Sequence, residues 1–220
     1  MARSRTRGTR GTLSRDEVVR AGVAIADGSG IGALSMRAVA RELGVEAMSL
    51  YHHVAGKEDL LDGMVDAVFG ELHLPRTDGD WRAELRRRSV SGREALLRHR
   101  WAVGLMDSRT SPGLATLRHH DAVLGCLRAA GFSVTMAAHA FALLDAHLYG
   151  FLVQEIALPF DEGDDLTPLA DAMLGENAEA LPHLAEVARE VTTRPGYRFG
   201  DEFHYGLDLV LDALEARRDG

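Results

Sequence analysis

The N-terminal part of the chain contains, at residues 34–54, the sequence LSMRAVARELGVEAMSLYHHV. Apolar residues recur at helical spacing over 36–43 and again over 46–53, with Gly44 between the two segments. Glycine adopts the left-handed backbone of a tight turn without steric cost, and a small residue such as Ala40 lets a second helix cross closely. The spacing therefore predicts a helix-turn-helix. Its shared core is expected to comprise Val39, Leu43, Leu50 and Val54.

A helix-turn-helix docks its second helix in the major groove of DNA while its first helix crosses the backbone. The polar side chains that these helices and their flanks offer to DNA are Arg37, Ser49, Tyr51, His52, His53 and Lys57. Lys57 also stands where the positive N-terminal end of the next helix can approach a phosphate. The alternative is an ordinary helical hairpin with a few polar surface residues, which has the same spacing.

Charge is divided unevenly along the chain. The net charge of the 220 residues is −8, which by itself argues against a nucleic-acid partner. Residues 1–57, however, hold nine basic groups against five acidic ones, a local charge of +4 that leaves −12 for the remaining 163 residues. Four arginines lie within the first ten residues. Nothing in catalysis calls for such an arm, whereas phosphate neutralisation does, so the pattern favours a DNA-binding head over an enzyme.

Helical periodicity continues through the rest of the chain, and no alternating stretch is long enough to predict a strand. We therefore expect an all-α protein. Ser14 and Glu17 form a capping box that starts a helix, which the glycines at 28–30 end. Beyond the helix-turn-helix, helices are expected over 57–72, 80–106, 113–130, 133–157 and 200–217, with less regular helix over 167–191.

Several functional classes are excluded by composition. Cys126 is the only cysteine, so the chain forms neither an intrachain disulfide nor a thiolate zinc site. No nucleophile elbow, phosphate-binding loop or zinc-protease motif is present, so we predict no enzyme, no metal site and no cofactor. The longest uncharged stretch has 16 residues and is too short to span a bilayer, so no membrane partner is expected.

Residues 14–70 resemble the DNA-binding domain of the tetracycline-repressor (TetR) family. The family signature leads from a helix-start serine through a small-residue turn to a Leu-Tyr-x-His-Val segment and a following lysine. Here that segment is Leu50-Tyr51-His52-His53-Val54, followed by Lys57. The resemblance extends more weakly along the chain and implies a homodimeric all-α repressor. Its three-helix N-terminal domain would bind operator DNA, and its helical C-terminal domain would dimerise and bind a small effector that releases the DNA.

Carried over to this sequence, the resemblance adds Ala47 and Met48 to the residues that contact bases or phosphates. Both are apolar where the tetracycline repressor reads bases with an amide and a proline, so its operator does not transfer, although a thymine methyl would suit them. Met106 stands at the position of the histidine that ligates the drug-bound metal, whereas Glu155 matches its acidic partner. A thioether is a poor ligand for Mg²⁺, so we predict no metal-chelated tetracycline ligand.

The effector is expected in the C-terminal part, where apolar side chains surround a few polar ones as a drug-sized and largely apolar ligand requires. The candidate ligand-binding residues are His99, Trp101, Leu105, Met106, Phe141, Leu144, His147, Phe151 and Glu155. The alternative is that these aromatics are core and the histidines are satisfied core or interface groups. The last helix has an apolar stripe wide enough for a partner as well as its own core. The predicted dimer interface comprises Phe203, Leu207, Val210, Leu211 and Leu214.

The sequence thus predicts a bacterial, cytoplasmic repressor, associated with the nucleoid when bound to DNA. It would bind a pseudo-palindromic operator as a homodimer and respond to a small molecule. The predicted domains are 1–56 for the arm and helix-turn-helix, 57–79 for a connecting helix and linker, and 80–220 for the effector and dimerisation domain. The alternatives are a helical enzyme or ligand-sequestering protein with a vestigial helix-turn-helix, and a ligand-independent activator of the same family.

Overall fold

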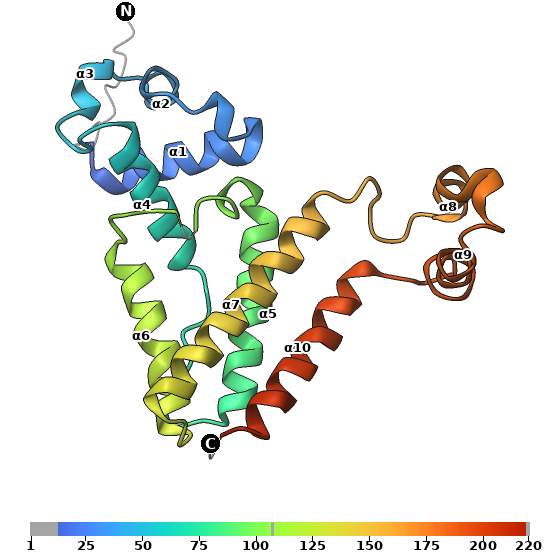
Figure 1. The fold of residues 1–220 in the computed structure, drawn as a ribbon. Helices are drawn as coiled ribbons and strands as arrows, with labels where there is room; N and C mark the ends of the chain where they lie inside the picture. Colours follow the sequence, from blue (N-terminus) through green and yellow to red (C-terminus); the bar gives the residue numbers. More distant parts are fainter. Residues whose placement is uncertain (1–12, 107, 219–220) are drawn as a thin grey trace, which may run out of the picture. The chain divides into compact units, whose positions relative to one another are not determined.

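The computed structural model describes residues 13–106 and 108–218, and within them every regular element is helical (Figure 1). The expected all-α class is therefore confirmed. The basic arm at residues 3–10 lies outside the described residues. The chain forms two compact units, which are described separately. The head unit contains the chain up to Leu74 together with Glu94–Ala122, and the C-terminal unit contains Pro75–Arg93 and the chain from Val123 onward.

The head unit begins with the four helices α1 to α4 and the 3₁₀ turn η1. Helix α1 packs against α2 and α4, and α2 packs against α3 (Figure 1). The later part of the unit is supplied by the end of α5, the 3₁₀ turn η2 and the start of α6. The elements are α1 (Arg15–Ser29), η1 (Ile31–Ala33), α2 (Met36–Leu43), α3 (Ala47–Leu50), α4 (Lys57–Phe69), α5 (Trp81–Arg98), η2 (Arg100–Ala102) and α6 (Leu114–Ala129).

Local hydrogen bonds set the ends of the first helices. The Ser14 backbone N–H donates to Glu17 Oε2 at 2.8 Å, and the Glu17 N–H donates to Ser14 Oγ at 3.2 Å, which completes the predicted capping box. Ser35 Oγ accepts from the Ala38 N–H at 3.1 Å at the start of α2. Gly44 has φ +65°, the left-handed conformation that the turn requires. These helix boundaries were therefore predictable from neighbouring residues.

The core of the head unit depends on a close approach of α1 to α4. A Cβ at Gly63 would lie 2.8 Å from Val19 Cγ2, and one at Gly22 would lie 2.8 Å from Met64 Sδ. Two glycines thus allow the helices to touch along their length. The predicted small residue Ala40 is buried as expected. The buried apolar residues of this core include Val18, Leu34, Val39, Leu50, Val54, Leu60 and Met64.

Three predicted helices are shorter than expected. Helix α3 ends at Leu50, because the Tyr51 and His53 N–H groups bond three residues back, to Met48 and Leu50, as in a tighter turn. Helix α4 ends at Phe69 instead of residue 72. The helix predicted to reach residue 106 ends at Arg98 and is followed by η2. Helical periodicity does not distinguish a continuous helix from short turns in series.

The C-terminal unit is organised around α7 and α10, which pack against each other (Figure 1). Ser133 caps α7 as predicted, since its Oγ accepts from the Met136 N–H at 3.2 Å. Burial raises the pKa of the Cys126 thiol to about 11, so it stays protonated and acts as an apolar side chain. The elements that follow α6 are α7 (Val134–Ile156), α8 (Thr167–Leu174), η3 (Gly175–Asn177), α9 (Pro182–Val187), the π-helical turn η4 (Ala188–Thr192) and α10 (Phe199–Glu215).

Four arginines of α5 join this helix to α7 and α10. Arg88 pairs with Asp145 of α7, and Arg93 pairs with Glu155 of the same helix. Two further pairs, Arg82 with Asp212 and Arg86 with Asp208, connect α5 to α10. Removing one partner of an ion pair is most costly where the pair has little exposure, and Arg88 is fully buried.

The two units differ from the domains that the sequence suggests. Residues 57–74, which lie in the predicted connecting helix and linker, belong to the head unit. Glu94–Ala122, which the sequence places with the effector domain, also packs with the head. The boundaries at 56 and 80 follow composition, whereas compact units follow contacts between residues that are far apart in the sequence.

Candidate functional site

The residues predicted to contact DNA come from three successive elements of the head unit. Met48 is 73% exposed and Tyr51 is 48% exposed, although both flank Leu50, which is fully buried. Large side chains that remain exposed beside a core residue are available to a partner. Arg37, His52 and Lys57 are exposed as well. The segment from α2 to the first residue of α4 therefore presents apolar, aromatic and basic side chains.

The other predicted DNA contacts are less open. Ser49 and His53 are half-buried, and Ala47 is half-buried and packs against the core of the head unit. Ala47 thus serves the packing of α3 and has only part of its methyl group left for DNA. Spacing in the sequence predicted that Ala47 lies on the second helix of the helix-turn-helix, but it did not predict how much of this side chain is buried.

The N-terminal turn of α4 holds its acidic residues in fixed pairs. The Ala55 N–H donates to Asp59 Oδ2 at 2.7 Å, and this bond together with Arg15 keeps the pKa of Asp59 below its ordinary value. Arg15 Nη2 lies 2.5 Å from Asp59 Oδ1. Lys57, the first residue of α4, remains exposed beside this neutralised turn. A cation at the start of a helix is unfavourable for the helix dipole, which is consistent with a role in phosphate binding.

An acidic stripe on α4 explains why Glu94–Ala122 packs with the head. Glu58, Asp62 and Asp66 are spaced four residues apart and therefore share one face. Arg109 Nη2 lies 2.9 Å from Glu58 Oε2, and its Nε lies 2.5 Å from Asp62 Oδ1. Asp66 Oδ1 accepts from the Thr116 N–H at 2.8 Å and so caps the start of α6. The i, i+4 spacing is a visible signal for this stripe, although it matches no functional motif.

The predicted ligand-binding residues fall into two groups, one in each unit. His99, Trp101, Leu105 and Met106 belong to the head unit. Trp101 and Leu105 pack against its core, and Met106 is buried. His99 Nδ1 lies 2.8 Å from Asp27 Oδ1, and the Trp101 indole donates to the same oxygen at 2.7 Å. These polar atoms already have partners on α1.

The second group lies in the C-terminal unit and forms an aromatic cluster between α7 and α10. The imidazole of His147 stacks on Phe203, with ring centroids 5.1 Å apart, and its Nε2 donates to the Phe203 carbonyl at 3.0 Å. Phe151 stacks on Phe199 at 4.9 Å. Leu144 is buried, whereas Phe141 is half-buried. His147 and Phe151, which the sequence predicts as ligand-binding residues, thus contact Phe203, which it predicts as a dimer-interface residue.

Glu155 has a protein partner. Arg93 Nε donates to Glu155 Oε2 at 2.9 Å, and Arg93 Nη2 also donates to this carboxylate, which gives a bidentate pair. The Arg93 guanidinium lies 5.5 Å from the centroid of Phe203, so it also contacts the aromatic cluster. Because both oxygens of this carboxylate accept hydrogen bonds from Arg93, they are less able to ligate a metal ion. Among the described residues, no group of three histidine, cysteine or acidic side chains is arranged to hold one.

The predicted apolar stripe of the last helix packs within its own protomer. Phe203, Leu207, Leu211 and Leu214 are buried within this protomer, where α10 packs against α7. Val210 is half-buried at the edge of that face. The most apolar stripe of a helix is used first for the core of its own chain, and these four side chains fill that core. The exposed face of α10 instead carries Tyr205 and Leu209.

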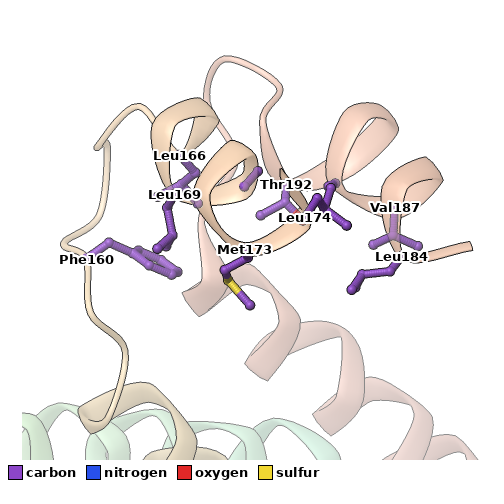
Figure 2. Close-up of a pocket in the computed structure, with 10 residues that line it drawn as sticks. Phe160, Leu166, Leu169, Met173, Leu174, Leu184, Val187 and Thr192 are labelled. Atoms are coloured by element: carbon purple, nitrogen blue, oxygen red, sulfur yellow. The ribbon is translucent and has the colours of Figure 1, made fainter. Parts of the chain in front are cut away.

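A small apolar cavity lies in the segment between α7 and α10 (Figure 2). Its volume is about 160 Å³. A drug-sized ligand needs roughly 300–1,000 Å³, so this cavity by itself does not suit the expected effector. Figure 2 shows Phe160 and Leu169 beside Met173, with Leu184 and Val187 contributed by α9.

Comparisons with known proteins agree with this architecture. The family model of bacterial regulatory proteins of the tetR family matches residues 18–64, and the model of the tetracyclin repressor-like C-terminal domain matches residues 74–218. The chain belongs to the TetR family. The expected resemblance is thereby confirmed over both the head and the C-terminal part.

Two TetR-family relatives are named repressors. The HTH-type transcriptional repressor DrrR1 of Streptomyces coeruleorubidus is 33% identical, over 96% of this chain and 80% of the relative. The class A tetracycline repressor from transposon 1721 of Escherichia coli is 31% identical, over 94% and 92%. Among solved structures, the TetR-family protein ActR of Streptomyces coelicolor in complex with actinorhodin is 26% identical, with a TM-score of 0.79 over 94% of this chain and 97% of ActR.

Proposed function

We propose that this TetR-family regulator is a transcriptional repressor that binds a pseudo-palindromic operator as a homodimer and is released by a small organic effector. The observation that carries the proposal is the exposure of Met48 and Tyr51 beside the buried Leu50, within a helix-turn-helix. A large apolar and an aromatic side chain held in this way can reach base edges, since the major groove offers thymine methyl groups as well as hydrogen-bonding atoms. Its place of action would be the bacterial cytoplasm, on the nucleoid when bound to DNA.

The effector we propose is drug-sized, largely apolar and bound without a metal ion. Support comes from the aromatic cluster of His147 and Phe151 and from the half-buried Phe141 on the same helix. Because Glu155 is paired with Arg93, and Met106 stands where a ligating histidine would be needed, Mg²⁺ has no donor set to bind here. Actinorhodin, the ligand in the ActR complex, is a first probe of the effector class.

A second copy of this chain would cover the open faces of α7 and α10. By length and composition α7 is apolar enough to cross a membrane, with a mean hydropathy of 1.3, yet only 28% of that stretch is buried in the protomer. Its exposed positions include four small residues, Ala138, Ala142, Ala146 and Gly150, together with Val153. Small residues let a second helix approach closely. We propose that these positions, with Tyr205 and Leu209 of α10, form the twofold interface that a near-palindromic operator requires.

The interface predicts that Leu209→Glu dissociates the homodimer. A carboxylate at a buried interface position is left unpaired, so the dimer dissociation constant is expected to rise at least about 30-fold. Sedimentation velocity over a range of protein concentrations measures it. Leu117→Glu on α6 is the matched control, because Leu117 is 51% exposed and Leu209 is 53% exposed. Equal dissociation constants for the two variants would contradict the proposed interface.

The repressor function is tested by selecting binding sites from a pool of random DNA with the purified full-length protein. We expect enrichment of pseudo-palindromes whose half-site centres lie about one helical turn apart, or a multiple of it, with binding that weakens steeply as salt rises. A pool that shows no enriched sequence at low salt would contradict the function. That outcome would favour a protein that sequesters a ligand and retains a vestigial helix-turn-helix.

A further inference from the structure

A second cavity lies wholly within the head unit, between the end of α1 and the end of α5. Its volume is about 490 Å³, compared with about 160 Å³ for the apolar cavity beside α8. A drug-sized ligand needs roughly 300–1,000 Å³, so this cleft is large enough for one. None of the residues predicted to contact DNA lines it. Its lining includes Asp27, Ile31, Leu97, Arg98, Arg100 and Trp101.

Trp101 gives the cleft a fixed aromatic wall. Its indole N–H donates to Asp27 Oδ1 at 2.7 Å, and its ring packs against the His99 imidazole in a T-shaped arrangement, with the centroids 6.2 Å apart. The half-buried ring also contacts the core of the head unit. An aromatic ring already held in this way loses little conformational entropy when a flat ligand stacks on it. Ile31 and Leu97 add apolar surface beside it.

The charged groups of the cleft differ in how they are matched. Arg98 Nη2 lies 2.6 Å from Glu71 Oε2, and Asp27 Oδ1 already has two hydrogen-bond partners. The charges of these three groups and of Arg100 sum to zero, so net charge does not select a ligand. Arg100 is exposed, and within the described part of the chain no carboxylate lies within ion-pair distance of its guanidinium. Arg100 is therefore the cleft cation that remains open to an anion.

We propose that this cleft binds a small aromatic carboxylate, whose ring stacks on Trp101 and whose carboxylate pairs with Arg100. Arginine suits this role because its planar guanidinium donates two parallel hydrogen bonds to a carboxylate. The site goes beyond the proposed effector site, because it belongs to the head unit and uses no residue of the aromatic cluster on α7 and α10. A ligand held here connects α1 to the end of α5 and stabilises the folded head by mass action.

The two tryptophans of the chain allow binding to be assigned to one unit. Trp101 lies in the head unit and Trp81 in the C-terminal unit, so labelling with fluorotryptophan gives a fluorine resonance for each. Trp101→Phe identifies the two signals. We expect 2-naphthoate, titrated into the labelled full-length protein without DNA, to shift the Trp101 resonance and leave the Trp81 resonance unchanged. A dissociation constant of about 1 mM is expected for a ligand of this size.

The charge of Arg100 is tested with a variant and with a neutral ligand. Arg100→Gln should weaken 2-naphthoate binding about fivefold, the effect of losing one exposed ion pair. The uncharged amide 2-naphthamide should bind the wild type more weakly than 2-naphthoate by the same factor. Arg118→Gln is the matched control and should bind 2-naphthoate like the wild type, because Arg118 is an exposed arginine of the head unit that does not line the cleft.

Four results would overturn the proposal. A Trp101 resonance that does not move at about 10 mM 2-naphthoate would exclude the site, as would a shift of the Trp81 resonance alone. Equal affinities of Arg100→Gln and Arg118→Gln would exclude the role of Arg100. Tighter binding of 2-naphthylmethylamine than of 2-naphthoate would show that Asp27 selects a cation instead. Because the titration contains no DNA, failure to bind an operator concerns only the repressor function.

Discussion

Replacing Tyr51 and Lys57 together by alanine is expected to lower operator affinity at least about 100-fold without dissociating the dimer. Both side chains are exposed, so their removal weakens the interaction with DNA and leaves the core of the head unit intact. A base-edge or phosphate contact contributes roughly 1–3 kcal/mol, and each subunit of the dimer loses two such side chains. Fluorescence anisotropy with a DNA site obtained by selection gives the affinity.

Salt dependence separates the two contributions to this decrease in affinity. Lys57→Ala removes one positive charge per subunit, so the slope of log affinity against log salt should become shallower by about one for each phosphate that is no longer neutralised. Tyr51→Ala should change sequence preference more than the slope. Arg217→Ala, which removes an exposed basic side chain beyond the end of α10, is the control and should bind DNA like the wild type. Undiminished operator affinity of the double variant would show that the recognition surface lies elsewhere.

Asp145→Ala is expected to destabilise the C-terminal unit by about 3–5 kcal/mol, because it removes the ion-pair partner of a buried arginine. The side chain of Arg88 is 1% exposed, and the substitution leaves its charged guanidinium in the core between α5 and α7 without Asp145. A buried charge that loses its ion-pair partner is costly, because the low-dielectric interior provides no solvation in place of that partner. Urea unfolding at one fixed protein concentration gives the change in the free energy of unfolding, since dimer stability depends on concentration.

Two further variants test whether the loss of stability in Asp145→Ala comes from breaking a buried ion pair. Replacing both partners with apolar residues of similar volume, as in Arg88→Met with Asp145→Leu, should recover most of the stability that Asp145→Ala removes. Glu162→Ala breaks an exposed pair with Arg198, whose atoms lie 2.9 Å apart, and should cost less than about 1 kcal/mol. If Asp145→Ala were no more destabilising than Glu162→Ala, the pair would not be a determinant of the core.

The acidic stripe of α4 connects this helix to other elements of the head unit. Helix α4 follows the helix-turn-helix directly, in the stretch that the sequence predicts as a connecting helix and linker. In the head unit, Asp62 and Asp66 of α4 hold Arg109 and the start of α6, so a shift of that segment would be transmitted to α4 by charged contacts. His99 and Trp101 make the equivalent connection to α1 through Asp27.

The predicted effector residues illustrate a limit of motif reasoning. His99 and His147 carry the same side chain in similar apolar stretches of sequence, and both were therefore predicted to line one pocket. The structure gives them unrelated partners, carboxylates for His99 and the Phe203 ring and carbonyl for His147. A histidine in an apolar segment fits a ligand site and a satisfied core position equally well until its hydrogen-bond partners are known.

What the sequence determined by itself is the set of local structures. The caps at Ser14, Ser35 and Ser133 and the turn at Gly44 depend on hydrogen bonds and backbone preferences within about four residues, which a linear pattern records. The exposed Tyr51 and Lys57 followed from the same local spacing. Only the tertiary structure decided which stripe of α10 is buried, and that Glu155 pairs with Arg93 and His99 with Asp27. These choices depend on pairings between residues 62 and 72 positions apart, where helical periodicity carries no information about the partner.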